Sequence, residues 1–352
     1  MKSLASDALS LPCGEILQHL GSIEGQQFAY GDDGHCELGA ARIRDAFGLT
    51  AEHDIHFVPT GTAANILGCL AMLRSPEDGI ISPDDGHLLI HEKGATEMFG
   101  HTVIAATTTD GKLDPMALDR VIATREDGVK PRALYLANAT DRGLAYTKDE
   151  LATLVNYTKE RGLYSFVDGA RLAMALAREG GALSLQDFGG LDFDMFWVGG
   201  AKNGGLGGEA LVVLNDELKQ GFRARMRGLG ALMSKSWVIG AQFERFFTEE
   251  DDGDLLWLRL ARHANTQAST IREGLRGLEN VELAFEGDGT GTNMLFPVLP
   301  IRVLERLQDE YHFYLPFGKV ADEKRGRVRL VCSWDTAPDT ATDFVEKVRQ
   351  YS

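Results

Sequence analysis

Short apolar runs alternate with helical patterns over residues 57–215, and this alternation restricts the fold more than any other feature. Two of the helical patterns cover residues 63–73 and 148–162, and the second stops at a glycine. Strands separated by helices predict a mostly parallel sheet that is covered on both faces, in an α/β protein. The runs expected to form strands are 79–82, 102–106, 133–137, 163–167, 195–198 and 210–214.

After about residue 217 the pattern changes to longer helices, over 234–247 and 256–278. Short apolar runs follow, with another helical pattern at 301–311. This half of the chain predicts a smaller α+β domain. We expect three parts, namely an N-terminal arm (1–22), a large domain (23–240) and a small C-terminal domain (241–352).

Composition restricts the class of protein. The chain has 352 residues, of which 44% are hydrophobic and 25% charged, as in an ordinary soluble globular protein. A formal net charge of -16 argues against nucleic-acid and anionic-membrane partners, because both need basic surfaces. No apolar run approaches the roughly 20 residues that span a bilayer, and the first residues make a poor secretion signal. Four scattered cysteines indicate reduced thiols, a cytoplasmic location and no metal site.

Thr60-Gly61-Thr62 lies between an apolar run and a helical pattern. Free N–H groups at a helix N-terminus, together with two hydroxyls, can hold a phosphate. Ordinary capping of the helix by threonine would explain the same residues.

Asp168 closes another apolar run, and Arg171 follows on the loop or first helical turn. An acid at the carboxyl end of a strand lies where ligands bind in such sheets. A purely structural Asp–Arg pair is an equally good interpretation.

Lys202 lies among glycines after the apolar run 195–198. The stretch is no P-loop, because Asn203 follows the lysine, and it lacks the dinucleotide fingerprint. The lysine could hold a phosphate, form an imine with a carbonyl compound, or lie on a surface loop. The flanking strands argue against the loop.

His87 and His91 can stack on an aromatic cofactor or move protons near neutral pH, although a lone histidine is more often structural. Arg329 alternates with apolar neighbours and is expected on a strand. A buried arginine near a site usually binds a carboxylate; a salt bridge with a neighbouring acid is the alternative.

A phosphate cup, a strand-end Asp, a strand-end Lys and a distant Arg, in this order, meet the needs of pyridoxal 5'-phosphate. The same stretches resemble the low-specificity threonine aldolases, in the fold-type I group of pyridoxal-phosphate enzymes. The matching pieces are YGDD (30–33), VPTGTAAN (58–65), HLLIHEKGATEMFGH (87–101), VDGARLAMAL (167–176), GGAKNGGLGGEA (199–210) and RLVCSW (329–334).

The resemblance implies an aspartate aminotransferase-like fold and a role for each matching residue. Lys202 carries the cofactor covalently, and Asp168 pairs with the pyridine nitrogen. The phosphate lies at Thr60, Gly61 and Thr62, and His87 stacks over the ring. Arg171 and Arg329 hold the substrate carboxylate, with Ser6 as a lesser contact and Arg171 also close to the cofactor.

Family members are homodimers or homotetramers with active sites shared between subunits. Tyr30 and Lys235 are therefore candidates to reach a neighbour's site, where Lys235 would contact the cofactor.

The chain departs from the family at three places. Ala8 stands where Asn is common, and Ala201 replaces the usual Ser or Thr before the lysine. Gly34-His35-Cys36 occupies a segment where Pro and Thr are common. These changes leave open the substrate and the reaction.

The expected reaction is retro-aldol cleavage of a β-hydroxy-α-amino acid, such as threonine, allo-threonine or phenylserine, to glycine and an aldehyde. His87, or His91 through water, would move the hydroxyl proton. One alternative is another reaction with the same cofactor, by a racemase, a transaldolase or a β-eliminating lyase. A second is a non-catalytic protein that keeps the cofactor. A nucleotide-binding enzyme is disfavoured because both glycine fingerprints are missing.

Overall fold

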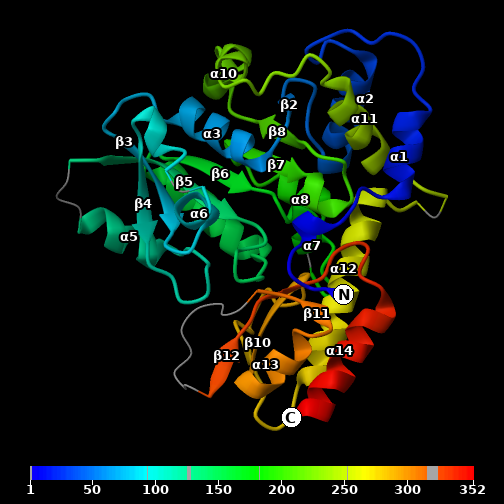
Figure 1. Ribbon diagram of the computed structural model, residues 1–352. Helices are drawn as coiled ribbons and strands as arrows, with labels where there is room; N and C mark the ends of the chain where they lie inside the picture. The colour runs from blue at the N-terminus through cyan, green and yellow to red at the C-terminus, as the bar shows by residue number, and fades with distance from the viewer. Residues whose placement is uncertain (1, 93, 125–127, 182, 252, 315–323) are drawn as a thin grey trace.

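The computed structural model describes residues 2–92, 94–124, 128–181, 183–251, 253–314 and 324–352. Its main sheet has seven strands in the order β2-β8-β7-β6-β5-β3-β4 (Figure 1). β8 is antiparallel to both of its neighbours, whereas the pairs from β7 to β4 are parallel. The strands are β2 Asp54–Val58, β3 Asp78–Pro83, β4 Thr102–Ala106, β5 Lys130–Ala137, β6 Tyr164–Asp168, β7 Met195–Gly199 and β8 Glu209–Val213. All six predicted strands are confirmed, as is the mostly parallel sheet.

Helices connect these strands and cover the sheet. They are α1 Gly14–Gly21, α2 Gly34–Phe47, α3 Gly61–Met72, α4 His87–Ile90, α5 Pro115–Ala123, α6 Lys148–Glu160, α7 Leu172–Leu176, α8 Leu185–Gly189, α9 Asp216–Lys219, α10 Phe222–Gly228 and α11 Trp237–Phe246. Short 3-10 turns occur at Asp7–Leu9 (η1), Glu97–Phe99 (η2) and Ala201–Asn203 (η3). The predicted helix over 148–162 begins with a capping box between Thr147 and Glu150. It ends before Gly162, whose φ of 63° lies in the left-handed region.

Alternate residues of each strand point to opposite faces of the sheet and enter two cores. In β7, Phe196 and Val198 belong to the core that includes residues of α2 and α6, whereas Trp197 belongs to the core that includes α3. The sheet is therefore buried on both faces, as its continuous apolar strands predict.

The C-terminal part has its own sheet and core (Figure 1). Its elements are α12 Leu256–Leu275, β9 Glu282–Ala284, β10 Met294–Pro300, α13 Ile301–Leu307, β11 Tyr311–His312, β12 Arg325–Arg327, β13 Leu330–Val331 and α14 Pro338–Tyr351. The prediction of a helix over 301–311 is wrong at its end, because Tyr311 leaves the helix and pairs with another strand. The three domain limits stay a prediction.

The N-terminal residues link the two parts. β1 (Lys2–Ser3) runs parallel to β11, and Val331 N donates to Leu4 O at 2.9 Å. Further along, Cys13 N donates to Gly204 O at 2.8 Å, in the loop that carries the candidate lysine. This stretch therefore runs from the C-terminal sheet to the edge of the main sheet. No helix among the described residues is long and apolar enough to cross a membrane.

Candidate active site

A pocket of about 210 Å³ lies where β6 and β7 end and where α3, α4 and β8 begin. This is the carboxyl edge of the parallel strands, where ligands bind in sheets of this kind. Six of the predicted site residues line it, namely Thr60, Gly61, Thr62, His87, Asp168 and Lys202, as do Ala8 and Ala201, where the chain departs from the family. The pocket lining does not include Ser6, His91, Arg171, Lys235 or Arg329.

Asp168 ends β6, is 3% exposed and is held by three donors. Its Oδ2 accepts from the Tyr135 hydroxyl at 2.6 Å and from Asn65 Nδ2 at 2.9 Å. Its Oδ1 accepts from the backbone N of Ala170 at 2.9 Å. Burial and the Asp168 charge raise the pKa of Tyr135, so its hydroxyl keeps the proton that it donates. The Asp168 carboxylate is thereby fixed at the pocket.

Lys202 lies in η3, directly after β7. Burial and the positive charge of Arg171 lower the pKa of its ammonium group, although Asp7 and Asp168 act in the opposite direction. A lowered pKa favours the neutral amine, which is the nucleophilic form. The glycines serve the loop itself: Gly205 N donates to Gly200 O at 3.0 Å, and a Cβ at Gly205 would lie 2.7 Å from that oxygen.

The Thr60-Gly61-Thr62 segment begins α3. Thr60 Oγ1 accepts from Ala63 N at 3.1 Å, so the capping interpretation holds for this residue. The first amides of the helix have no intrahelical partner, and Gly61 and Thr62 line the pocket. Gly61 is also required by packing, because a Cβ there would lie 2.8 Å from the Trp197 ring. Capping and anion binding are therefore compatible.

His87 is the first residue of α4, and its Nδ1 lies 3.1 Å from Glu92 Oε1. Burial lowers the pKa of His87, but the Glu92 hydrogen bond and the Asp168 charge outweigh burial and raise it. Asn65 Nδ2 donates to both Glu92 and Asp168 and so links the histidine to the acid of β6. The His91 ring is exposed, and its centre lies 5.2 Å from that of His87.

Arg171 precedes α7 and is paired with an acid of the N-terminal stretch. Its Nε and Nη2 donate to Asp7 Oδ2 and Oδ1 at 2.7 and 2.8 Å. Asn293 Nδ2 also donates to Asp7 Oδ2, at 3.0 Å. Ser6 caps η1 by accepting from Ala8 N at 3.2 Å, which fixes the turn that carries Asp7. The role of Arg171 toward a substrate carboxylate stays a prediction.

Arg329 lies in an extended bridge opposite Tyr314, as its alternating neighbours predict. Its Nη2 donates to Ala5 O at 3.5 Å. Burial and the charge of Arg171 lower the pKa of Arg329. The buried guanidinium of Arg171 therefore acts on the partly buried guanidinium of Arg329 by like-charge repulsion.

The sequence analysis missed Glu209, which lines the pocket and is 6% exposed. It begins β8 and pairs with Gly199 and Val58, the last residues of β7 and β2. Its Oε2 accepts from Gly200 N at 2.7 Å. Burial raises the pKa of Glu209 to about 7, against the effects of the Gly200 amide and Lys202. An acid at the start of an apolar strand, seven residues after the lysine, was the available signal.

Asn65, Glu92, Asp7 and Trp197 were also missed. Asn65 connects Trp197 and Glu92 to Asp168, since it accepts from Trp197 Nε1 at 3.0 Å and donates to Glu92 and Asp168. A polar residue within the apolar stretch of α3 was the signal for Asn65. Nothing local marks Asp7, because its partner lies 164 residues away.

The pocket fits pyridoxal 5'-phosphate in its chemistry. Lys202 has a lowered pKa for bonding to a carbonyl carbon, and Asp168 is oriented for a ring nitrogen. The N-terminus of α3 offers amide donors for a phosphate. These groups lie in one pocket. The sequence contains neither of the two glycine fingerprints of nucleotide-binding sites.

The fold and the site define an enzyme of the aspartate aminotransferase fold. The match to a solved aspartate aminotransferase from Rhodobacter sphaeroides covers 99% of this chain and 93% of the aminotransferase chain, with a TM-score of 0.70. The two sequences are only 16% identical, so this match shows the fold alone. The chain belongs to the beta-eliminating lyase family, whose model matches residues 3–297.

Within this family, two similar proteins are threonine aldolases. The low specificity L-threonine aldolase of Pseudomonas aeruginosa is 32% identical over 99% of this chain and 97% of its own length. The solved structure of a Leishmania major threonine aldolase is 34% identical, with a TM-score of 0.92 and 99% of each chain covered. The resemblance and the fold class predicted from the sequence are thereby confirmed.

Proposed function

We propose that this chain uses pyridoxal 5'-phosphate to cleave a β-hydroxy-α-amino acid of the threonine, allo-threonine or phenylserine type into glycine and an aldehyde. The observation that carries the proposal is the pairing of Lys202, whose pKa is lowered, with the oriented carboxylate of Asp168 in one pocket. The full-length similarity to threonine aldolases supports the choice of reaction.

When bound, the cofactor accepts the electron pair that is released as the Cα–Cβ bond breaks. Lys202 would hold its carbonyl carbon, and Asp168 its ring nitrogen. The amides of Gly61 and Thr62, with the Thr62 hydroxyl, would hold the phosphate. His87 would lie against the ring.

His87 is also the residue proposed to take the proton of the β-hydroxyl group. Its Nδ1 is held by Glu92, which leaves Nε2 to accept that proton. As the proton leaves, the β-carbon becomes the carbonyl carbon of the aldehyde. Proton transfer of this kind is worth about 10²–10⁴-fold in rate.

Arg329, together with Arg171, is proposed to fix the substrate carboxylate. Arg171 is already oriented by Asp7, and Arg329 lies close enough to Arg171 for the Arg171 charge to lower the pKa of Arg329. Fixing the carboxylate decides which Cα bond faces the ring and therefore which reaction occurs.

We further propose a homo-oligomer in which Tyr30 and Lys235 reach a neighbour's site. Tyr30 N donates to Ser234 O at 3.2 Å, so the segments that carry Tyr30 and Lys235 lie next to each other. Neither Tyr30 nor Lys235 lines the Lys202 pocket of its own chain. Both side chains are exposed.

A cytoplasmic location is supported by four buried cysteines with free thiols.

The cofactor is tested by absorbance. We expect a yellow protein that sodium borohydride bleaches, a Lys202→Ala variant without the colour, and a coloured Lys130→Ala control, since Lys130 is an exposed lysine. A colourless protein that does not respond to added pyridoxal phosphate would refute the proposal.

The reaction is tested with threonine, phenylserine and alanine. Aldehyde release from the first two supports the aldolase. Exchange of the alanine α-proton without cleavage would identify a racemase, and a coloured protein that turns over no amino acid would identify a non-catalytic relative.

A further inference from the structure

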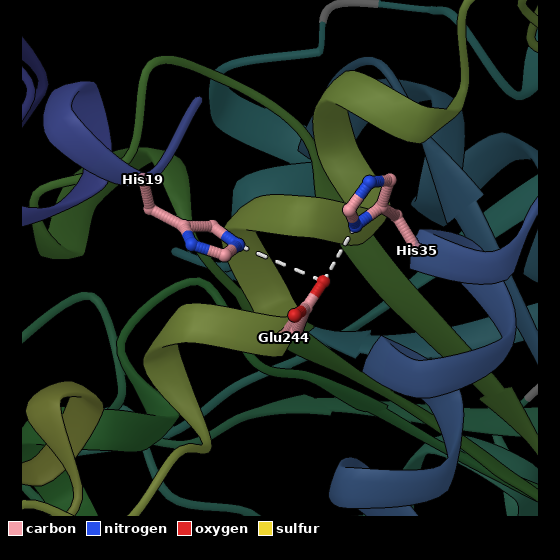
Figure 2. Close-up of side chains that lie close together, drawn as sticks. All are labelled: His19, His35 and Glu244. Atoms are coloured by element: carbon pink, nitrogen blue, oxygen red, sulfur yellow. Dashed lines mark hydrogen bonds and ion pairs between the residues drawn. The ribbon is translucent and has the colours of Figure 1, made fainter. Parts of the chain in front are cut away.

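Three helices bring two histidines and a glutamate together outside the Lys202 pocket. His19 lies on α1, His35 on α2 and Glu244 on α11. In Figure 2 both imidazole rings direct a nitrogen at the same carboxylate oxygen. None of the three residues lines the Lys202 pocket, so this cluster is separate from the proposed active site.

The three candidate ligand atoms lie close enough together to share one ion. His35 Nδ1 lies 2.7 Å and His19 Nε2 lies 3.6 Å from Glu244 Oε2, and all three atoms lie within 4.8 Å of one another. Tetrahedral zinc with ligand bonds of about 2.0–2.2 Å separates neighbouring ligand atoms by roughly 3.3 Å. These two separations fall on either side of that value, so small side-chain rotations would complete the site.

We propose that His19, His35 and Glu244 bind a divalent transition-metal ion of the zinc class. Two imidazoles and a carboxylate are typical ligands of such ions. Water would supply the fourth ligand, since the side chains of His19, His35 and Glu244 are 24%, 23% and 13% exposed.

Hydrogen bonding within the cluster explains only part of it. It accounts for His35, but His19 Nε2 is a buried atom without a hydrogen bond to any described residue. A buried polar atom of this kind calls for an ion or a water. The neighbouring Arg42 and Thr248 side chains bind the backbone oxygen of Glu244, which leaves its carboxylate directed at the histidines.

A bound ion would join three helices that meet around the N-terminal stretch. α1 follows Cys13, whose backbone N bonds to the loop of Lys202. The ion would therefore fasten α1 to α2 and α11, and its effect would be on stability more than on the reaction itself.

The test is a titration of the purified full chain, with its cofactor, by Zn²⁺ in calorimetry and by Co²⁺ in visible absorbance. We expect one ion per chain and the visible bands of tetrahedral Co²⁺. His19→Ala and His35→Ala should weaken Zn²⁺ binding more than about 100-fold. This exceeds the loss of about 10–100-fold that is typical when a residue hydrogen-bonded to a metal ligand is replaced. Glu244→Gln keeps a hydrogen-bond acceptor but should also weaken binding, whereas His53→Ala, outside the cluster, should not.

Equal Zn²⁺ binding by the wild type and the cluster variants would overturn the proposal, as would a thiolate charge-transfer band that indicates Cys36 as a ligand. Because the titration follows the ion and not turnover, its failure would leave the proposed aldolase reaction untouched. A raised melting temperature with Zn²⁺ in the wild type, absent in Glu244→Gln, gives a second measure that does not depend on how well each variant folds without metal.

Discussion

Arg171 and Asp7 form a buried pair in which the carboxylate receives two parallel guanidinium hydrogen bonds, of 2.7 and 2.8 Å. Asp7 is fully buried, and the Arg171 charge is among the causes that lower its pKa although burial acts in the opposite direction. An acid of the N-terminal stretch thus orients an arginine of the main sheet, beside the candidate lysine.

Asp7→Asn should lower the free energy of unfolding by about 3–5 kcal/mol, because it leaves a buried guanidinium without its counter-charge. Denaturant unfolding measures this. Glu77, which forms an exposed ion pair with Lys130, provides the control, since Glu77→Gln should leave the free energy of unfolding unchanged. Wild-type stability in Asp7→Asn would contradict a structural role for the pair.

Glu92→Gln should move the acid limb of the pH profile of kcat/KM to lower pH. Glu92 raises the pKa of His87, and His87 must lose its proton before it can accept one from the substrate. Removing the charge lowers that pKa, so the base form persists in more acidic solution. Glu97→Gln, at an exposed acid of η2, should leave the profile in place. An unmoved limb in Glu92→Gln would exclude His87 as the base.

Arg329→Lys should raise KM for the amino acid by about 10–100-fold and leave the cofactor absorbance unchanged. A lysine cannot reproduce two-point binding of a carboxylate, and a hydrogen bond to a charged group is worth about 1.5–3 kcal/mol. Steady-state kinetics gives KM. The matched control is Arg327→Lys, whose guanidinium lies over the Phe285 ring. An unchanged KM in Arg329→Lys would assign the carboxylate to another residue.

Glu209→Gln should remove a pH dependence of stability. Burial raises the pKa of Glu209 from 4.5 to about 7, so between these values the folded chain binds more protons than the unfolded chain. Stability therefore falls as pH rises through this window. From about pH 5 to about pH 8 the variant should gain about 2 kcal/mol relative to the wild type. Unfolding at both pH values checks this, and parallel curves would show an ordinary pKa.

Mixing Lys202→Ala with Lys235→Ala chains should restore activity if subunits share their sites. Each variant alone should be inactive, but random mixed dimers hold one intact site, so about a quarter of the activity should return. Lys202→Ala mixed with Asp168→Asn should stay inactive, because both residues line the pocket of one chain. No recovery after verified subunit exchange would show that Lys235 does not act in a neighbour's site.

Local pattern was enough to predict six of the seven strands of the main sheet and the pocket residues at the ends of two of them. Asp168 and Lys202 could be found because Asp168 ends an apolar strand and Lys202 lies in the turn after another, and the carboxyl ends of parallel strands meet at one edge. Glu209 escaped this rule because β8 runs antiparallel, which brings the beginning of that strand to the same edge.

Long-range pairing could not be predicted. Asp7 finds Arg171 through the tertiary fold. The expectation of no metal site rested on cysteine spacing, whereas His19, His35 and Glu244 come from helices up to 225 positions apart along the chain, counting from 19 to 244. The departure at Gly34-His35-Cys36 marked one of these residues without indicating its neighbours.

The course of the N-terminal stretch has a consequence for biosynthesis. Asp7 needs Arg171 and Asn293, and β1 needs β11. A ribosome delivers the earlier partners long before the later ones, so the newly made chain must keep Asp7 without its full set of partners while the main sheet folds. The full set of Asp7 bonds is therefore complete only after residue 293 has emerged, and Leu4 gains its bond from Val331 N only after residue 331 has emerged.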